Sequence, residues 1–218
     1  MQPTVSIEGF GSTAVGTIYA IGRNYSEHAL ELGNAVPVGE PVVFLKAPSS
    51  VRTLAGGALA FASETFHFEA ELVLRIGQNV ALGSKNVGWS SVAGIALGLD
   101  LTRREKQNEL KSKGLPWTLA KSFAGSSLIS PFIQTSELGG QDFFQFKLLV
   151  DGKMRQQGDT RQMIFDVPSI LQYLSSFNSL LTGDLVFTGT PAGVGAICKG
   201  DHFSLELTEP HRKWDGTL

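Results

Sequence analysis

Apolar residues surround two carboxylates in the run FHFEAELVLRIG at 66–77. The flanks of this run read as a strand. Because side chains of a strand alternate between faces, Glu69 and Glu71 are expected on the same side, roughly 7 Å apart. The dry side would be formed by Phe68, Ala70 and Leu72. The pattern therefore predicts a strand that carries two neighbouring carboxylates on one face.

Further apolar runs predict short strands. VVFLK at 42–46 is one, and an apolar, glycine-rich stretch over 87–102 is another that delivers Asp100 at its end. Apolar residues alternate from 144 to 150 and lead into Asp151-Gly152, a dipeptide typical of a hairpin turn. Because the chain contains 25 glycines and 9 prolines, turns and short strands are favoured over long helices.

Two short segments have helical composition. In RNYSEHALELG, Ser26 is a possible helix cap and Gly33 a stop, which leaves barely two turns. Residues 102–113 are predicted as a helix with Thr102 as the cap and Gly114 as the stop.

A third helix is predicted over 167–177, with Pro168 tolerated in its first turn. Its apolar face would consist of Ile170, Leu171, Leu174 and Phe177. Residues 49–62 read as a loop and a further short strand. The pattern as a whole indicates an α+β fold, a mixed, rolled β-sandwich with short flanking helices. No repeat or linker divides it, so residues 1–218 are expected to form a single domain.

Composition and charge narrow the function classes. The net charge of −2 gives no support to a role at nucleic acid or a membrane surface, and no apolar run approaches the 18 or so residues of a membrane span. The one cysteine, Cys198, excludes an internal disulfide and suggests a reducing compartment. It is expected to be a small buried hydrophobe. Without a signal-peptide pattern, the expected location is the cytoplasm.

The two glutamates admit two interpretations. Taken alone, this segment favours a half-buried strand with a wet glutamate face. However, Asp100 at a strand end and Lys121 in an apolar setting raise the case for a metal site. Neighbouring carboxylates repel unless a positive group lies between them, and oxygen ligands suit Mg²⁺, with Mn²⁺ or Ca²⁺ possible. The expected ligands are Glu69, Glu71 and Asp100.

The order Glu-x-Glu, then Asp, then Lys, then GTPAGVG resembles the fumarylacetoacetate hydrolase family. The chain is most similar to its small single-domain members, the acylpyruvases and oxaloacetate decarboxylases, from about 18 to about 207. One departure is the segment KSFAGSSLISPF at 121–132, which lacks an aspartate that many members carry. GTPAGVG contains no GK[ST], so it is not a phosphate-binding P-loop.

The resemblance implies roles for individual residues. NYxxHxxE makes His28 and Glu31 an acid–base dyad on a lid near 22–34, whereas the residues alone would favour a surface ion pair. Lys121 would be catalytic beside the metal. The implied substrate-binding residues are Arg23, Gln107 and Thr190, the last in a loop that holds the substrate carboxylate.

Other polar residues keep simpler interpretations. Gln107 is equally compatible with an exposed helix amide. Lys46 is expected near the mouth of the site or as a solvated strand-end lysine. The basic group Arg103, Arg104 and Lys106 reads as a solvated helix face, and the histidines outside the motifs read as structural.

The expected function is metal-dependent hydrolysis of a carbon–carbon bond in an acylpyruvate, such as fumarylpyruvate or acetylpyruvate. A 2-oxo acid can chelate the cation, which stabilises the pyruvate enolate that forms, and His28 would activate the attacking water. The alternatives are oxaloacetate decarboxylation, oxaloacetate keto–enol tautomerisation and isomerisation of 2-hydroxyhepta-2,4-diene-1,7-dioate. A non-catalytic module that binds 2-oxo acids is a further alternative. The resemblance also implies a homodimer.

Overall fold

The computed structural model describes residues 2–33, 35–54 and 64–218. Its larger sheet has eight strands and contains two parallel pairs, β13–β3 and β5–β9. The strand order is β4 (Val42–Lys46), β3 (Ile18–Gly22), β13 (Leu185–Phe187), β7 (Ala70–Ile76), β8 (Val92–Asp100), β9 (Ser127–Ile129) and β5 (Val51–Thr53), with β10 (Ile133–Gln134) also paired to β8.

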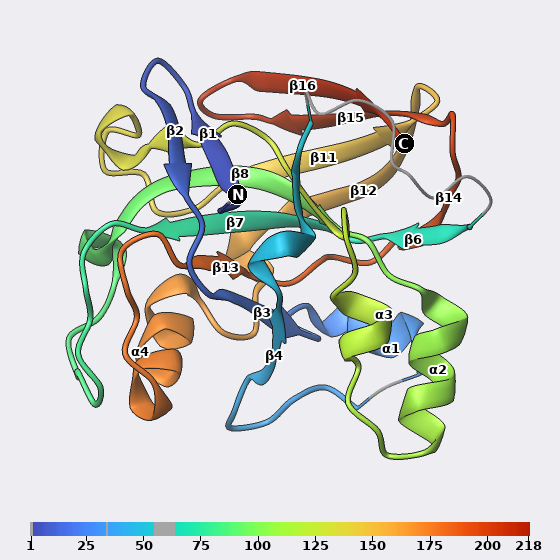
Figure 1. The fold of residues 1–218 in the computed structure, drawn as a ribbon, viewed down its shortest axis with the longest axis horizontal. Helices are drawn as coiled ribbons and strands as arrows, with labels where there is room; N and C mark the ends of the chain where they lie inside the picture. Colours follow the sequence, from blue (N-terminus) through green and yellow to red (C-terminus); the bar gives the residue numbers. More distant parts are fainter. Residues whose placement is uncertain (1, 34, 55–63) are drawn as a thin grey trace.

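A second, antiparallel sheet packs against the first (Figure 1). Its order is β12 (Lys153–Asp159), β11 (Gln145–Val150), β15 (His202–Leu207) and β16 (Arg212–Thr217). Two further pairs join β1 (Thr4–Ile7) to β2 (Gly11–Ala14), and β14 (Gly195–Ile197) to β6 (Phe66–Phe68). The curled mixed sheet with few short helices confirms the predicted α+β sandwich.

The central strands of the larger sheet are covered on both faces. One face of β7, including Leu72 and Leu74, shares a core with Phe146 and Leu148 of β11. The other face contributes Val73 to a second apolar cluster. All but one of the seven residues of β7 are buried, so this strand does not have the half-wet alternation expected of it.

The helices lie at the margins of this sandwich. α1 (Ser26–Glu31), α2 (Arg104–Ser112) and α3 (Thr118–Lys121) gather at one end, and α4 (Val167–Phe177) lies apart from them (Figure 1). Four 3₁₀ turns, η1 (Pro48–Ser50), η2 (Trp89–Ser91), η3 (Thr135–Glu137) and η4 (Thr160–Gln162), complete the described elements.

Several predicted boundaries are confirmed. The β11–β12 hairpin turns at Asp151 and Gly152, whose φ angles of 49° and 72° are those of the expected turn class. Gly33 and Gly114 follow α1 and α2 with positive φ, as helix stops do. α4 spans the predicted residues, and Asp166 caps it by accepting a hydrogen bond from the Ser169 amide.

Other predictions of local structure are wrong. Ser26 is the first helical residue after Tyr25, and α2 begins after Arg103, because Thr102 is buried and hydrogen-bonded at the end of β8. Phe177 is 51 % exposed and packs on Tyr173 instead of the core. The run 66–77 is two strands, since Glu69 separates β6 from β7 and each strand pairs with a different partner.

The expectation of a buried Cys198 is also wrong, because this residue is exposed just after β14. Of the segment predicted as loop and strand at 49–62, the part up to Leu54 contains η1 and β5, and residues 55–62 lie outside the described residues. Within the described ranges, every helix is too short or too polar to cross a membrane.

Candidate active site

The three predicted metal ligands converge where β7 begins and β8 ends. In this antiparallel pair Ala70 lies opposite Leu99, so the neighbouring residues Glu69 and Asp100 meet, and the Asp100 amide donates to the Glu69 carbonyl. One carboxylate oxygen each from Glu69, Glu71 and Asp100 lies within 4.8 Å of the others. The three residues are 5 %, 2 % and 0 % exposed, which excludes a wet glutamate face.

Lys121, predicted beside the metal, binds this cluster from the end of α3. Its Nζ donates to Oε2 of Glu69 at 2.6 Å and to Oδ2 of Asp100 at 2.7 Å. The Thr102 hydroxyl accepts a third hydrogen bond at 2.7 Å. Lys121 is therefore a fully engaged buried cation between two carboxylates.

Two further cations bind the cluster against expectation. Lys46 on β4 is neither at a mouth nor solvated, because it is buried with its Nζ 2.6 Å from Oδ1 of Asp100. Arg104 pairs with Oε1 of Glu69 and is largely buried, so it does not belong to a solvated helix face. Sequence patterns missed both because their burial depends on tertiary partners.

The electrostatics single out Glu71. Burial raises the pKa of Glu69, but Lys121 and Arg104 outweigh it and hold that pKa below its usual range. Burial, and then the charges of Asp100 and Glu69, raise the pKa of Glu71 well above its usual range. Among the described residues only the Gly189 amide hydrogen-bonds to the Glu71 side chain, at 2.7 Å. The cluster therefore has a carboxylate that lacks a cationic partner.

These residues fit a divalent cation. The donor set consists entirely of carboxylate oxygens, which suits Mg²⁺ or Mn²⁺. Within the described part of the chain, Oε1 of Glu71 accepts no hydrogen bond, and Glu71 has the least positive charge around it of the three carboxylates. A cation held there would remove the repulsion that raises the Glu71 pKa.

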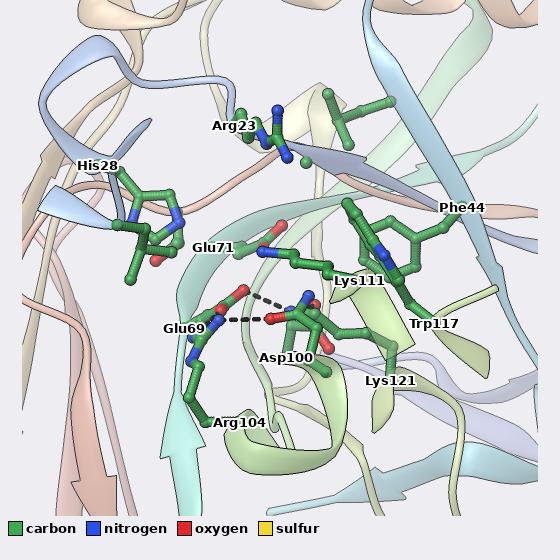
Figure 2. A pocket seen from close by; sticks show the side chains of 15 residues that line it. Arg23, His28, Phe44, Glu69, Glu71, Asp100, Arg104, Lys111, Trp117 and Lys121 are labelled. Carbon is green, nitrogen blue, oxygen red and sulfur yellow. Dashed lines mark hydrogen bonds and ion pairs between the residues drawn. The ribbon is translucent and has the colours of Figure 1, made fainter. Parts of the chain in front are cut away.

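His28 on α1 lines the same pocket (Figure 2), and Glu31 follows it one helical turn later. His28 is 4 % exposed, so the alternative of a surface ion pair is wrong. Its Nδ1 is 3.6 Å from Oε2 of Glu31 and has no hydrogen-bond partner in the described ranges of the chain. Burial lowers the pKa of His28, and Glu69 opposes this in part. A neutral imidazole thus stands at the pocket with an acidic neighbour.

The GTPAGVG loop hydrogen-bonds to several groups around the carboxylate cluster. The Gly189 amide binds Glu71, and the Gly193 amide donates to both carboxylate oxygens of Glu31 at 3.2 Å. The Thr190 hydroxyl donates to the Ala70 carbonyl at 2.9 Å and lines the pocket. These contacts go to groups of the protein itself, a use of the loop that the sequence did not reveal.

Gln156 on β12 supports the backbone of the site, and no sequence pattern indicated this role. Its side chain accepts from the Ala70 amide at 2.9 Å and donates to the Thr190 hydroxyl at 2.8 Å. It thereby joins the start of β7 to the glycine loop and fixes the backbone between the two glutamates.

The remaining wall of the pocket combines polar and aromatic residues. Gln107 is buried and accepts from Arg104 at 2.6 Å, so it is not an exposed amide. Lys111 also lines the pocket, with its Nζ 5.2 Å from the centre of the Trp117 ring (Figure 2). Sequence reasoning missed Lys111, although its i+4 spacing from Gln107 places both on one helix face. The free volume among the lining residues, which include Arg23, is about 30 Å³.

Known proteins of similar sequence and structure are enzymes that act on 2-oxo acids. The chain is 41 % identical over 186 residues to oxaloacetate tautomerase FAHD1 of Bos taurus, covering 84 % of this chain and 83 % of that protein. It is 40 % identical to the oxaloacetate decarboxylase of Dictyostelium discoideum over 88 % of both chains. The crystal structure of fumarylpyruvate hydrolase from Pseudomonas aeruginosa in complex with Mn²⁺ and pyruvate matches with a TM-score of 0.91. It is 34 % identical, over 99 % of this chain and 95 % of that one.

Residues 17–213 match the family described as Fumarylacetoacetate (FAA) hydrolase C-terminal. The match spans both sheets, the carboxylate cluster and the glycine loop. With this match and the 41 % identity to a curated relative, the chain is a member of the fumarylacetoacetate hydrolase family.

Proposed function

We propose that this protein is a divalent-cation-dependent enzyme that interconverts the keto and enol forms of oxaloacetate. The observation that carries the proposal is the buried His28, whose pKa is lowered by burial, in the same pocket as the Glu69, Glu71 and Asp100 cluster. Keto–enol conversion needs a base that removes a proton next to a carbonyl, and a positive centre that stabilises the resulting enolate. The 41 % identity to an oxaloacetate tautomerase supports this substrate.

The cation is proposed to be Mg²⁺, and the Mn²⁺ named with the Pseudomonas aeruginosa structure supports a divalent ion of this kind. Glu69, Glu71 and Asp100 would hold it. When bound, it supplies Lewis-acid stabilisation of the negative charge that develops on the 2-oxo oxygen.

The protein's own groups have distinct tasks. Neutral His28 takes the proton from C3 of oxaloacetate and returns a proton to complete the conversion. Glu31, 3.6 Å from Nδ1, orients the imidazole and stabilises its protonated form. Burial lowers the pKa of Lys121, but Asp100 and Glu69 outweigh it and raise that pKa, so the ammonium group stays charged beside the enolate. Lys121 therefore acts as a fixed positive charge and not as a base.

The proposed substrate-binding residues are Arg23, Gln107 and Thr190, all of which line the pocket. Residues 22–33 with α1 would act as a lid over it, held shut by the Glu31–Gly193 contact. The expected lid also included residue 34, which lies outside the described residues.

Hydrolysis of an acylpyruvate is the second candidate. The TM-score of 0.91 to a fumarylpyruvate hydrolase favours it, and His28 could equally take a proton from an attacking water. Oxaloacetate conversion remains the first candidate because the sequence identity to the oxaloacetate tautomerase, 41 %, exceeds the 34 % identity to the fumarylpyruvate hydrolase.

A direct comparison tests the proposal. Oxaloacetate dissolved as its enol is added to metal-depleted protein with and without Mg²⁺, and the enol absorbance is followed. Pyruvate release from oxaloacetate, acetylpyruvate and fumarylpyruvate is measured on the same preparation. Mg²⁺-dependent loss of the enol that is faster than pyruvate release supports the proposal. Pyruvate release from an acylpyruvate without accelerated enol loss would replace it with the hydrolase.

Assembly and location are proposed with it. A homodimer is supported by the family resemblance and by an apolar groove lined by β4 and the segment before α3 (Val42, Val43, Phe44, Leu45, Pro116, Trp117 and Thr118). The glycine-rich strand β8 does not offer such a surface, because it is a buried central strand of the larger sheet. Light scattering should give twice the 23.4 kDa chain mass.

A cytoplasmic location is also proposed. It rests on the single cysteine, and cell fractionation tests it.

A further inference from the structure

One side of the pocket carries positive charge with no negative partner. Lys111 on α2 and Arg23, just after β3, both line the pocket. Neither side chain forms an ion pair within the described part of the chain. The Nε of Arg23 is buried and has no hydrogen-bond partner among the residues that the structure describes. A buried, unpaired donor of this kind is costly unless a ligand satisfies it.

The carboxylates of the pocket do not fill that need. Glu69 is paired with Lys121 and Arg104, and Asp100 is paired with Lys46 and Lys121. Glu71 is oriented by the Gly189 amide and faces the metal-binding cluster. The charges of Arg23 and Lys111 are therefore additional to those that balance the acidic triad.

The two cations are near enough to repel each other. Burial lowers the pKa of Lys111, and the charge of Arg23 is the next cause of this lowering. Figure 2 shows Lys111 reaching across the pocket between Arg23 and the acidic cluster, with Trp117 beside it. The Trp117 ring, 5.2 Å from Nζ, restricts the lysine without neutralising it. An anion between Lys111 and Arg23 would relieve the repulsion.

We propose that Lys111, together with Arg23, binds the second carboxylate of a dicarboxylic 2-oxo acid and so selects such acids over monocarboxylic ones. The inference rests on the proposed function for its placement of the substrate. The 2-oxo acid end of the ligand occupies the Glu69, Glu71 and Asp100 end of the pocket. The distal carboxylate then extends toward Arg23, where the ammonium group of Lys111 lies between Arg23 and the acidic cluster (Figure 2). Oxaloacetate and pyruvate differ only in this carboxylate, so they form the natural test pair.

The test compares Lys111→Met with the matched control Lys113→Met. Lys113 lies just past the end of the same helix but is exposed and bonded to Glu109. Calorimetric binding of oxaloacetate and of pyruvate is measured at saturating Mg²⁺, together with enol conversion of oxaloacetate and deuterium exchange into the methyl group of pyruvate. Lys111→Met should weaken oxaloacetate binding and lower its kcat/KM by about 10- to 100-fold, the usual worth of a charge-assisted hydrogen bond. Pyruvate binding and exchange should change by less than about 2-fold, and Lys111→Arg should restore most of the loss.

Equal weakening for both ligands in Lys111→Met, or no weakening for oxaloacetate, would overturn the inference. So would wild-type protein that binds oxaloacetate no better than pyruvate. A wild-type protein that prefers oxaloacetate in the calorimeter but does not convert its enol contradicts the proposed function alone. In that case, loss of the preference in Lys111→Met still supports the carboxylate site.

Discussion

The Nζ of Lys46 and the Oδ1 of Asp100 form an ion pair of 2.6 Å that is almost entirely closed to solvent. Lys46 also donates to the Lys121 carbonyl, so it fixes both the carboxylate and the end of α3. With Lys121 and Arg104, this lysine brings three positive charges to the three carboxylates of the cluster. The metal-free cluster is therefore close to electrically neutral when Glu71 is ionised, and a divalent cation adds two charges that the substrate anion can balance.

Lys46→Met should destabilise the metal-free protein. The free energy of unfolding should fall by about 3 kcal/mol, the lower end for breaking a buried pair, because Lys121 still compensates Asp100. The cluster then has one excess negative charge, so added Mg²⁺ should raise the Tm of this variant more than that of the wild type. Calorimetry with and without Mg²⁺ measures both effects, with Lys153→Met, at an exposed strand position, as the control. An equal Mg²⁺ shift in both proteins would contradict this account of the charges.

Glu71→Gln should remove metal binding without loosening the fold. Because the pKa of Glu71 is raised in the folded state, its ionised form disfavours folding as the pH rises through that pKa. A neutral glutamine resembles the protonated acid, so the metal-free variant should be at least as stable as the wild type at pH 7.

Metal titration by calorimetry should detect no Mg²⁺ binding to Glu71→Gln, and activity should be lost. The exposed-surface variant Glu105→Gln should bind the metal normally. Retained activity in Glu71→Gln, or in wild-type enzyme treated with EDTA, would remove the basis for the metal site.

The sequence allowed prediction of those features that depend on local pattern. Same-face spacing and a strand end brought Glu69, Glu71 and Asp100 together, because β7 and β8 pair as adjacent antiparallel strands. The Asp151-Gly152 turn followed from its local φ requirement. Lys46 and Arg104 could not be placed, since a long cationic side chain is buried only where a distant carboxylate compensates it. Glu31 and Gly193 are 162 positions apart, and no local pattern indicates their contact.

Glu31→Ala should loosen α1. The variant removes the acceptor for the Gly193 amide and the acidic neighbour of His28. We expect kcat to fall by at least about 10-fold and amide hydrogen exchange in α1 to become faster. A segment that closes over an active site is held by few contacts, so the loss of one of them has a large effect. Glu27→Ala on the same helix is the control, since Glu27 is exposed. Unchanged exchange in Glu31→Ala would show that the Gly193 contact does not hold the helix.

The pH dependence of enol conversion should report His28. Because burial lowers the His28 pKa, the neutral base persists below pH 6.5, and the acid limb of kcat/KM should have its midpoint below that value. The same sign applies to stability. The neutral, buried form contributes stability above the unfolded pKa of about 6.5, and this contribution is lost as the pH falls. Because kcat/KM reports the free enzyme, a midpoint above 6.5 would mean that a group other than His28 limits the reaction at low pH.

His28→Ala separates proton transfer from charge stabilisation within one protein. Enol conversion and acylpyruvate hydrolysis both need a base, so each should fall by about two to four orders of magnitude. Oxaloacetate decarboxylation involves no proton abstraction or water attack and depends chiefly on the bound cation as an electron sink, so it should fall far less. Some shared loss is expected because His28 is a buried residue of the lid helix α1 itself, and its truncation leaves a gap between this helix and the pocket. His211→Ala, at an exposed position, controls for the loss of a histidine as such.

All three reactions should be measured on one preparation at saturating Mg²⁺. Equal losses in all of them would mean that His28 acts through closure or binding, and its assignment as the base would be wrong.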